Sequence, residues 1–518
     1  MFITSIEQLG GAPDVVVVGA GAAGILIAAE LAAAGKRVLL LEAGDKVASS
    51  DTAFEDVSSV GRPFTGLERG RARGLGGTTN RWGGQIVALE PLVFEERPWL
   101  GESGWPIRAS DLDDAHERTL DLLGMQRRLD DQAVWQRLRV APPPPGEGLQ
   151  LFLTRWLPEP NFARLFSTVL ERNTNLLVAT GACVRSLGQS SEGSRIGVSV
   201  TLGEQCAYLD AEHVVLASGT VEIARLLMQP MAEHRLAPWA DNRWVGRGFV
   251  DHIDCDAGTV TPLDQRRFHA VFDAAVVDGL KYLPKLKLAS SFQRDNQMLG
   301  IAAHFVSSST HAQQLAVLKT IARNVLNRTA VAHEGFDFSR ALQLADISAR
   351  TASRYLLHRR LYNPTDGGIQ LRLTGEQVPV FDSGLTLGNE TDRSGMLKAN
   401  LDWRIDGQEL KTLSLFAAKV AQYLESTGLA RVELDPLLLE RDPAFVEKLE
   451  DGFHHMGMAR MGRDPTDGVV DRDLRVFGTE NLFVAGAATF RSAGFANPTL
   501  TALALTMRLA DAIKAGTV

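Results

Sequence analysis

The chain has 518 residues, of which 45% are hydrophobic and 22% charged, and its formal net charge is −8. This length predicts roughly two to four structural units of about 150 residues each. The mild acidity argues against a nucleic-acid partner, whose phosphates require a basic face, and favours a neutral or cationic small molecule. Because no apolar run reaches the ~20 residues of a membrane span, we expect none.

The cysteine content and the N-terminus both bear on location. Cys183, Cys206 and Cys255 are widely and unevenly spaced, which is neither a disulfide framework nor a metal-site pattern. Residues 1–13 lack a basic region followed by an apolar stretch, so no export signal is expected. These features predict reduced thiols, no bound metal and a cytoplasmic location.

The first element is a buried parallel strand at 14–18, followed by the glycine pattern GAGAAG at 19–24 and an Ala/Leu-rich helix. A second strand at 38–41 ends at Glu42, near the spacing expected of an acidic residue that binds a ribose hydroxyl. Strand, glycines, helix and acid together form a complete βαβ dinucleotide-binding pattern. This pattern does not distinguish FAD from NAD.

Each glycine of this pattern has its own task. Gly19 permits the tight turn, Gly21 lets the backbone approach a pyrophosphate, and Gly24 lets the helix pack on the strand. The helix N-terminus would then face the phosphates.

A second glycine-rich segment follows at 74–84, with five glycines in eleven residues and no helical or strand periodicity. Glycine permits close backbone approach and positive φ. We therefore expect a loop held against a ligand, with threonine hydroxyls and the Asn80 amide able to donate to it. A flexible surface turn is the alternative interpretation.

From about 90 to 170 the periodic signals weaken, and the proline run at 142–145 followed by Gly146 excludes helix. This segment is interpreted as a lid over the site. Alternation returns with strands at 175–187, 196–202 and 213–217, the last leading into a helix at 221–228.

The middle of the chain is richer in strand signals, and it contains a helical insert at about 312–361. The apolar stripe of the insert is expected to pack on the protein's own core. Its basic end could instead contact a partner or anionic lipid, but a solvated face is favoured. The strands are expected at 274–277, 282–288, 369–373 and 397–403, and the basic end comprises Arg350, Arg354, Arg359 and Arg360.

The C-terminal region combines a strand at 481–486 with a last helix at 498–513, and Pro498 suits its first turn. Two short motifs accompany these elements: His454-His455-Met456-Gly457 and the sequence FANPT at 495–499. Dinucleotide-type elements therefore lie at both ends of the chain, with a β-rich unit between them.

In this order, the GAGAAG turn, the GGTTN loop, the HHMG turn, the LFVAG strand and the ANPTLTALAL helix resemble the glucose-methanol-choline (GMC) family of FAD oxidoreductases. The likeness covers about half of the chain and looks closest to the pyranose oxidase and glycoside 3-dehydrogenase branch. It implies an α/β fold with a Rossmann-like FAD-binding domain built from discontinuous segments. The second domain would be α+β, with a mostly antiparallel sheet flanked by helices.

The resemblance assigns roles to single residues. His454 matches the catalytic histidine and Asn497 the second catalytic position, and both would also contact substrate. His455 is interpreted as structural. Gln377 matches a substrate-binding glutamine of the sugar-oxidising branch. Because Arg81 precedes Trp82, where covalently flavinylated members have histidine, FAD is expected to be noncovalent.

The predicted cofactor contacts share a place in a glycine turn, at a strand end or at the start of the last helix. They are Gly19, Gly21, Ala22, Gly24, Glu42, Ala43, Arg73, Gly76, Gly77, Thr78, Thr79, Asn80, Trp82, Gly83, Val184, Ala217, Ser218, Gly219, Gly486, Ala487, Asn497, Pro498 and Thr499. The predicted domains are an FAD-binding domain of 1–100, 171–255 and 443–518, a lid of 101–170, and a substrate-binding domain of 256–442.

The implied activity is oxidation of a secondary alcohol of a sugar or glycoside to a ketone, with hydride transfer to flavin N5 and His454 as general base. Oxidation of a non-sugar alcohol, a flavin monooxygenase, and a noncatalytic or electron-relay flavoprotein remain alternatives. The electron acceptor, whether oxygen, a quinone or a protein, and the oligomeric state are left open.

Overall fold

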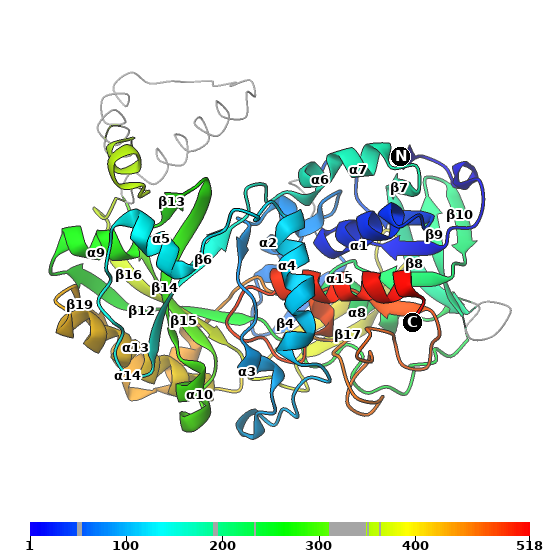
Figure 1. The fold of residues 1–518 in the computed structure, drawn as a ribbon. Helices are drawn as coiled ribbons and strands as arrows, with labels where there is room; N and C mark the ends of the chain where they lie inside the picture. The colour runs from blue at the N-terminus through cyan, green and yellow to red at the C-terminus, as the bar shows by residue number, and fades with distance from the viewer. Residues whose placement is uncertain (49–53, 190–194, 233–234, 310–348, 350–351, 362–363) are drawn as a thin grey trace, which may run out of the picture.

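The computed structural model describes all residues except 49–53, 190–194, 233–234, 310–348, 350–351 and 362–363. Two units lie side by side (Figure 1), and the chain passes between them several times. One unit is built on a parallel sheet and contains both termini. The other is built on a large, mostly antiparallel sheet, so the predicted mixed α/β class is confirmed.

The six-stranded sheet of the first unit has the strand order β1-β7-β3-β2-β11-β21, and its neighbouring strands pair in parallel. Every residue of β2 and β3 is buried, as the apolar runs predicted. Helix α1 packs against α15 on one face of this sheet (Figure 1). The bounds are β1 Phe2–Ile3, β2 Val15–Val18, α1 Ala22–Ala33, β3 Val38–Glu42, β7 Leu176–Thr180, β11 His213–Leu216, α8 Thr220–Met228, β21 Leu482–Val484 and α15 Thr499–Ala515.

The nine-stranded sheet of the second unit follows the order β19-β12-β16-β15-β14-β6-β5, with β13 beside β14 and β20 beside β12. Side chains along β16 alternate between buried and half-buried, because one face packs on helix α13 (Glu409–Ser426). The strands are β5 Gln85–Ile86, β6 Leu149–Trp156, β12 His252–Pro262, β13 Ala275–Val277, β14 Leu280–Leu288, β15 Ile301–Ser307, β16 Ile369–Glu376, β19 Ala430–Leu434 and β20 Glu450–Asp451.

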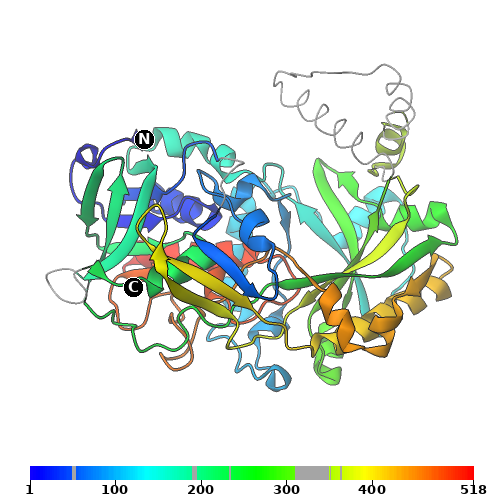
Figure 2. The same ribbon diagram turned by 180° about the vertical axis from the view of Figure 1, so that it is seen from behind.

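Two smaller sheets complete the fold. One is an antiparallel sheet of β8 (Ala182–Gln189), β9 (Ile196–Leu202) and β10 (Gln205–Leu209). In the other, β4 (Val57–Gly61) pairs in parallel with β18 (Leu397–Trp403), which pairs with β17 (Gly384–Thr391). Figure 2 shows this second sheet beside the parallel-sheet unit. The remaining α-helices are α2 Gly66–Arg69, α3 Pro91–Phe94, α4 Asp113–Leu122, α5 Asp131–Leu138, α6 Phe162–Leu165, α7 Ser167–Arg172, α9 Gln265–Phe272, α10 Ser290–Asn296 and α14 Pro436–Glu440.

Strand pairing crosses the predicted domain boundaries at two places. Residues 384–403 were predicted in the substrate-binding domain, and β17 and β18 form a sheet with β4, which comes from the segment predicted as FAD-binding domain. Buried residues of this sheet share the hydrophobic core of the nine-stranded sheet. Conversely, β5 and β6 come from the segments predicted as FAD-binding domain and lid, yet both extend the nine-stranded sheet. Which sheet a strand joins is decided by pairing with strands far away in the sequence. Local periodicity carries no information about this pairing.

The segment predicted as a lid is also built differently. Helix α4 packs on α15, and β6 is a full strand of the large sheet. The proline run lies in the loop before β6, where the carbonyl of Pro143 accepts a hydrogen bond from the Tyr423 hydroxyl of α13 at 2.8 Å. The run is therefore attached to the outer helix of the sheet.

Most of the predicted helical insert lies outside the described residues, including Arg350 and the whole apolar stripe. At its described basic end, Arg354 forms an ion pair with Asp273 at 2.7 Å, and Arg360 donates to the carbonyls of Asp273 and Ala270. These contacts are within the protein and Arg360 is buried, so the predicted solvated face is wrong for Arg360. Among the described residues, no helix is both long and apolar enough to cross a membrane.

Candidate active site

The turn after β2 has the geometry of a dinucleotide cradle. A side chain on Gly24 would place its Cβ 1.8 Å from the Gly19 carbonyl oxygen, and one on Gly19 would lie 2.5 Å from the Cα of Ser218. The corresponding position at Gly21 has no atom within 4 Å. Gly19 and Gly24 are therefore required for packing, whereas Gly21 leaves open space at the N-terminus of α1, where a pyrophosphate is favoured.

Glu42 connects this turn to the glycine-rich loop. Its carboxylate accepts hydrogen bonds from the backbone N–H groups of Ala20, Gly44 and Gly74, each at 2.9 Å. Burial raises the pKa of Glu42, and the three N–H donors oppose that rise. The predicted ribose contact of Glu42 remains a prediction, and the structure adds a role in fixing the turn.

The loop at 74–84 lies directly against the glycine turn, as its composition predicted. Gly76 N donates to the Ala20 carbonyl at 2.9 Å, and a side chain on Gly77 would approach the Cα of Gly21 to 2.9 Å. The threonine and amide donors, however, bind within the protein: Thr79 Oγ1 donates to the Gly76 carbonyl, and Asn80 Nδ2 donates to the carbonyls of Leu75 and Gly77. The predicted donation from these two side chains to a ligand is thus replaced by loop-internal bonds, and the loop backbone is what faces the cradle.

Other predicted cofactor residues fall into two groups. Ser218 is half-buried, with a buried Oγ that has no hydrogen-bond partner, and Gly219 has a φ of +85° with open space beside it. A buried hydroxyl without a partner is rare and fits a ligand contact. Arg73 and Trp82 instead bind protein: Arg73 pairs with Asp56 at 2.5 Å, and Trp82 Nε1 donates to the Pro160 carbonyl at 2.8 Å. The open glycine positions and the unpartnered hydroxyl together fit a bound dinucleotide.

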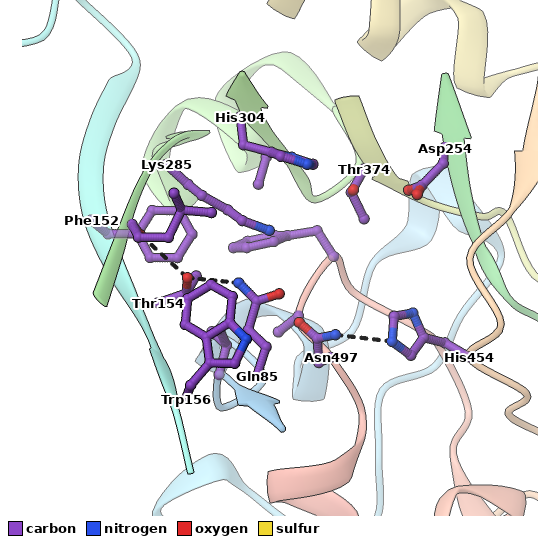
Figure 3. A pocket seen from close by; sticks show the side chains of 15 residues that line it. Gln85, Phe152, Thr154, Trp156, Asp254, Lys285, His304, Thr374, His454 and Asn497 are labelled. Carbon is purple, nitrogen blue, oxygen red and sulfur yellow. Dashed lines mark hydrogen bonds between the residues drawn. The ribbon is translucent and has the colours of Figure 1, made fainter. Parts of the chain in front are cut away.

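The two predicted catalytic residues meet in space. His454 follows β20, Asn497 immediately precedes α15, and Asn497 Nδ2 lies 2.9 Å from His454 Nε2 (Figure 3). In this orientation the amide N–H donates to Nε2, so Nε2 carries a lone pair and the ring proton is on Nδ1. The pair therefore presents a basic nitrogen beside an amide.

The surroundings keep the His454 ring neutral. Burial lowers its pKa well below the ordinary value, and the nearby His252 and Lys285 lower it further. The His252 ring packs edge-on against it, with centroids 4.7 Å apart. Asp251 fixes the backbone of both histidines. Its Oδ1 accepts hydrogen bonds from the backbone N–H of His454 at 2.8 Å and from that of His252 at 2.6 Å.

A cavity of about 270 Å³ opens in front of this pair. Its far wall is the nine-stranded sheet, and its near wall is the segment that leads into α15 (Figure 3). The lining is mixed, with aromatic rings and several polar side chains. It comprises Gln85, Val87, Phe152, Thr154, Trp156, Asp254, Leu283, Lys285, Ala302, His304, Thr374, His454, Phe495, Ala496 and Asn497.

Gln377 is a correction, because it does not line this cavity. It is fully buried, its Oε1 accepts from Asp251 N and Trp403 Nε1 at 2.9 Å each, and its Nε2 donates to the Arg404 carbonyl. Both oxygen lone pairs and one N–H of the amide are thus used within the protein, away from the cavity. Its contact with Asp251 makes it a support for the segment that carries His454.

His455 occupies a structural position, as predicted. Its ring packs against Phe64 and Phe249, with centroids 5.3 and 6.0 Å apart. Burial lowers its pKa to about 3, and it is not among the cavity-lining residues.

Sequence patterns did not single out the polar residues of the far wall, Asp254, Lys285, His304 and Thr374. They lie on β12, β14, β15 and β16, and their polarity resembles the ordinary solvent face of an alternating strand. Only the placement of that face against Asn497 makes them part of a site.

Two family models match the chain. That for the GMC oxidoreductase C-terminal region covers residues 379–506, which include both His454 and Asn497, and that for an NAD(P)-binding Rossmann-like domain covers residues 17–61. The C-terminal part of the chain is thus similar to the GMC oxidoreductases. The first match contains the predicted catalytic pair, and the second contains the start of the glycine cradle.

Among curated GMC relatives, the chain is 27% identical over 158 residues to 2-methyl-1,2-propanediol dehydrogenase of Mycolicibacterium austroafricanum, which covers 30% of the chain and 27% of that protein. It is 27% identical over 158 residues to the fructose dehydrogenase large subunit of Gluconobacter japonicus, with the same coverages. It is 32% identical over 132 residues to C-glycoside 3-oxidase of Microbacterium trichothecenolyticum, covering 24% of each protein. The matched segments thus span about a quarter of these relatives.

The fold also matches solved structures over nearly its whole length. Pyridoxine 4-oxidase from Mesorbium loti superposes with a TM-score of 0.56 at 18% identity, covering 96% of this chain and 98% of that one. A fungal aryl-alcohol oxidase superposes with a TM-score of 0.56 at 13% identity, covering 98% of this chain and 99% of the other. At these identities the likeness establishes the fold alone.

Proposed function

We propose that this protein is a GMC oxidoreductase that binds FAD noncovalently and oxidises a secondary alcohol of a sugar or glycoside to a ketone. The observation that carries the proposal is the His454–Asn497 pair, at 2.9 Å, on the wall of a cavity of about 270 Å³. Alcohol oxidation requires a base for the hydroxyl proton and a hydride acceptor for the carbinol hydrogen.

His454 is the base. Its neutral ring carries a lone pair on Nε2, which accepts the hydroxyl proton of the substrate once the Asn497 N–H turns from Nε2 to the substrate oxygen. Burial, with the nearby His252 and Lys285, keeps the pKa of His454 low, so the ring is already unprotonated at neutral pH when substrate enters. Asp251 fixes the His454 backbone, and the packed His252 ring limits rotation of the imidazole.

Asn497 orients the alcohol. Its side-chain amide lies beside Nε2 and can bind the same substrate oxygen, which fixes the direction of the carbinol C–H bond. Bound FAD would supply the hydride acceptor, flavin N5. The N-terminus of α15, which begins at Thr499, would favour negative charge near the flavin pyrimidine.

The sugar assignment rests on the chemistry of the lining and on the relatives. Gln85 donates to Thr154 at 2.7 Å on the cavity wall, and Trp156 adds an aromatic face next to these polar groups. Polar side chains for hydroxyls and an aromatic face for a ring suit a sugar better than a purely apolar alcohol. Fructose dehydrogenase and C-glycoside 3-oxidase are relatives whose names specify sugars.

Anaerobic mixing of the yellow holoenzyme with sugars, glycosides and non-sugar alcohols tests the proposal, because flavin absorbance bleaches on reduction. Bleaching by a glycoside without NADPH is expected, and it separates this activity from a monooxygenase or a relay flavoprotein. His454→Ala should slow reduction by about 10²–10⁴-fold and Asn497→Ala by less, with flavin still bound. His455→Ala is the control and should retain the wild-type rate.

Two results would contradict the proposal. Bleaching by non-sugar alcohols alone would replace the sugar assignment, and a His454→Ala rate within about threefold of wild type would refute the base assignment. Repeating the active reaction with oxygen, a quinone and a protein acceptor assigns the acceptor. Fractionation of the source cells tests the proposed cytoplasmic location.

A further inference from the structure

The cavity wall contains an ammonium group without an ionic partner. Lys285 lies on β14 with 9% of the residue exposed, and its side chain reaches toward the middle of the cavity on the side away from His454 (Figure 3). Among the described residues, no carboxylate lies within 4 Å of its Nζ and no hydrogen bond to it is formed. Its neighbours on the same strand differ, since Lys287 is paired with Glu90 and Lys281 stacks on Trp156.

The charged groups around Lys285 do not neutralise it. Asp254 is the acidic side chain that attracts it, but Arg372 lies closer to that carboxylate, at 3.5 Å. His304 lines the same wall, and burial lowers its pKa well below the ordinary value, so it is neutral. His454 and His252 are also neutral, since burial lowers the pKa of each. Lys285 therefore presents to the cavity an ammonium with no ion-pair partner within 4 Å among the described residues, while the Asp254 carboxylate, held by Arg372, lies further along the same lining.

Such a charge needs an anion. Burial of an ammonium without a counter-charge is costly, and it lowers the pKa of Lys285 to about 8. At pH 7 the group is still mainly protonated. A ligand carboxylate would remove the imbalance through a charge-assisted hydrogen bond, which is among the stronger polar contacts.

We infer that the substrate carries a carboxylate that binds Lys285 while its carbinol carbon lies at His454 and Asn497. This inference rests on the proposed function and narrows it to an acidic sugar, such as a uronic acid or its glycoside. A phosphate dianion fits less well, because Lys285 is accompanied on the wall by the Asp254 carboxylate and by neutral side chains such as Thr374 and Gln85. The chain's overall charge of −8 does not oppose this binding, because the low-dielectric wall makes the local charge dominate.

The test compares two compounds that differ only at C6, methyl β-D-glucuronide and methyl β-D-glucoside. Their dissociation constants are measured by anaerobic calorimetry on the holoenzyme in a His454→Ala background, where turnover is slow. The glucuronide should bind at least about 10-fold more tightly. Lys285→Met should weaken glucuronide binding about 10- to 100-fold and change glucoside binding by less than about threefold.

Two further measurements make the test specific. Lys287→Met removes the same charge from the same strand, but its ammonium is already paired, so the preference should persist. With Lys285 intact, the preference should shrink as the pH rises from 7 to 10, because the ammonium loses its proton. The pH series needs no substitution at Lys285, so it decides the question even if Lys285→Met fails to fold.

Several results would overturn the inference: equal binding of the two compounds, binding of neither, or equal weakening of both by Lys285→Met, which would make Lys285 a general hydroxyl donor. Failure of the proposed oxidation is distinguishable from these. A glucuronide that binds through Lys285 but never reduces the wild-type flavin would leave this inference standing and refute the oxidation.

Discussion

The buried pair Arg97–Glu376 lets the stability of the site be tested by a single substitution. Arg97 is 1% and Glu376 0% exposed, and two parallel hydrogen bonds of 2.7 and 2.8 Å join them. Glu376 also accepts from Gly300 N at 3.0 Å and Gly494 N at 3.1 Å. The pair thus ties the end of β16 to the loop that carries Phe495 into the cavity.

Replacing Arg97 by Met keeps the apolar stem and leaves a buried carboxylate without its cation. Loss of one partner of such a pair destabilises a protein by about 3–5 kcal/mol, because the remaining charge is uncompensated. We expect Arg97→Met to lower the free energy of unfolding at pH 7 by that amount. Equilibrium urea unfolding followed by tryptophan fluorescence measures it.

The double variant Arg97→Met/Glu376→Met removes both charges and should be more stable than the sum of the two single losses predicts. The coupling energy from this cycle should be at least about 2 kcal/mol. An Arg97→Met variant within about 1 kcal/mol of wild type would refute the reasoning, and so would strictly additive losses.

Three further predictions concern His455, Glu42 and Arg81. His455, whose pKa is lowered to about 3, stays unprotonated in the folded chain while the unfolded chain takes up a proton below pH 6.5. Stability therefore falls as pH falls, and His455→Leu should remove roughly 2 kcal/mol of the loss between pH 6.5 and 5, measured by urea unfolding at both values; an unchanged pH dependence would contradict the shift. Glu42→Gln replaces a carboxylate that accepts three N–H bonds, so the dissociation constant of FAD, measured by fluorescence titration of the apoprotein, should rise at least about 10-fold; wild-type affinity would place Glu42 outside the cofactor site. Because Arg81 precedes Trp82, acid precipitation should release all of the flavin into the supernatant, and a yellow pellet would mean a covalent bond.

Much of the dinucleotide cradle could be predicted from the sequence, because its signals are local. The turn at 19–24, both flanking strands and Glu42 lie within about 30 residues, and backbone sterics alone demand glycine at Gly19 and Gly24. The motifs around His454 and Asn497 could also be recognised from the sequence, and the structure brings these two residues together.

The tertiary structure decided what depends on distant partners. Strand pairing joined 384–403 to β4 and β6 to the nine-stranded sheet, and a hydrogen bond from Tyr423 fixed the proline run on an outer helix. Gln377 could not be placed from a motif, because its role depends on which backbone groups reach its amide.

The charge of the substrate cavity shows the same limit most clearly. Net composition suggested a neutral or cationic ligand, whereas the cavity wall presents the unpaired ammonium of Lys285. A lysine in an alternating strand has the same local pattern whether it faces water or a cavity. Its chemistry is set by the sheet register and by the segment packed opposite, and both arise only when residues hundreds of positions apart come together.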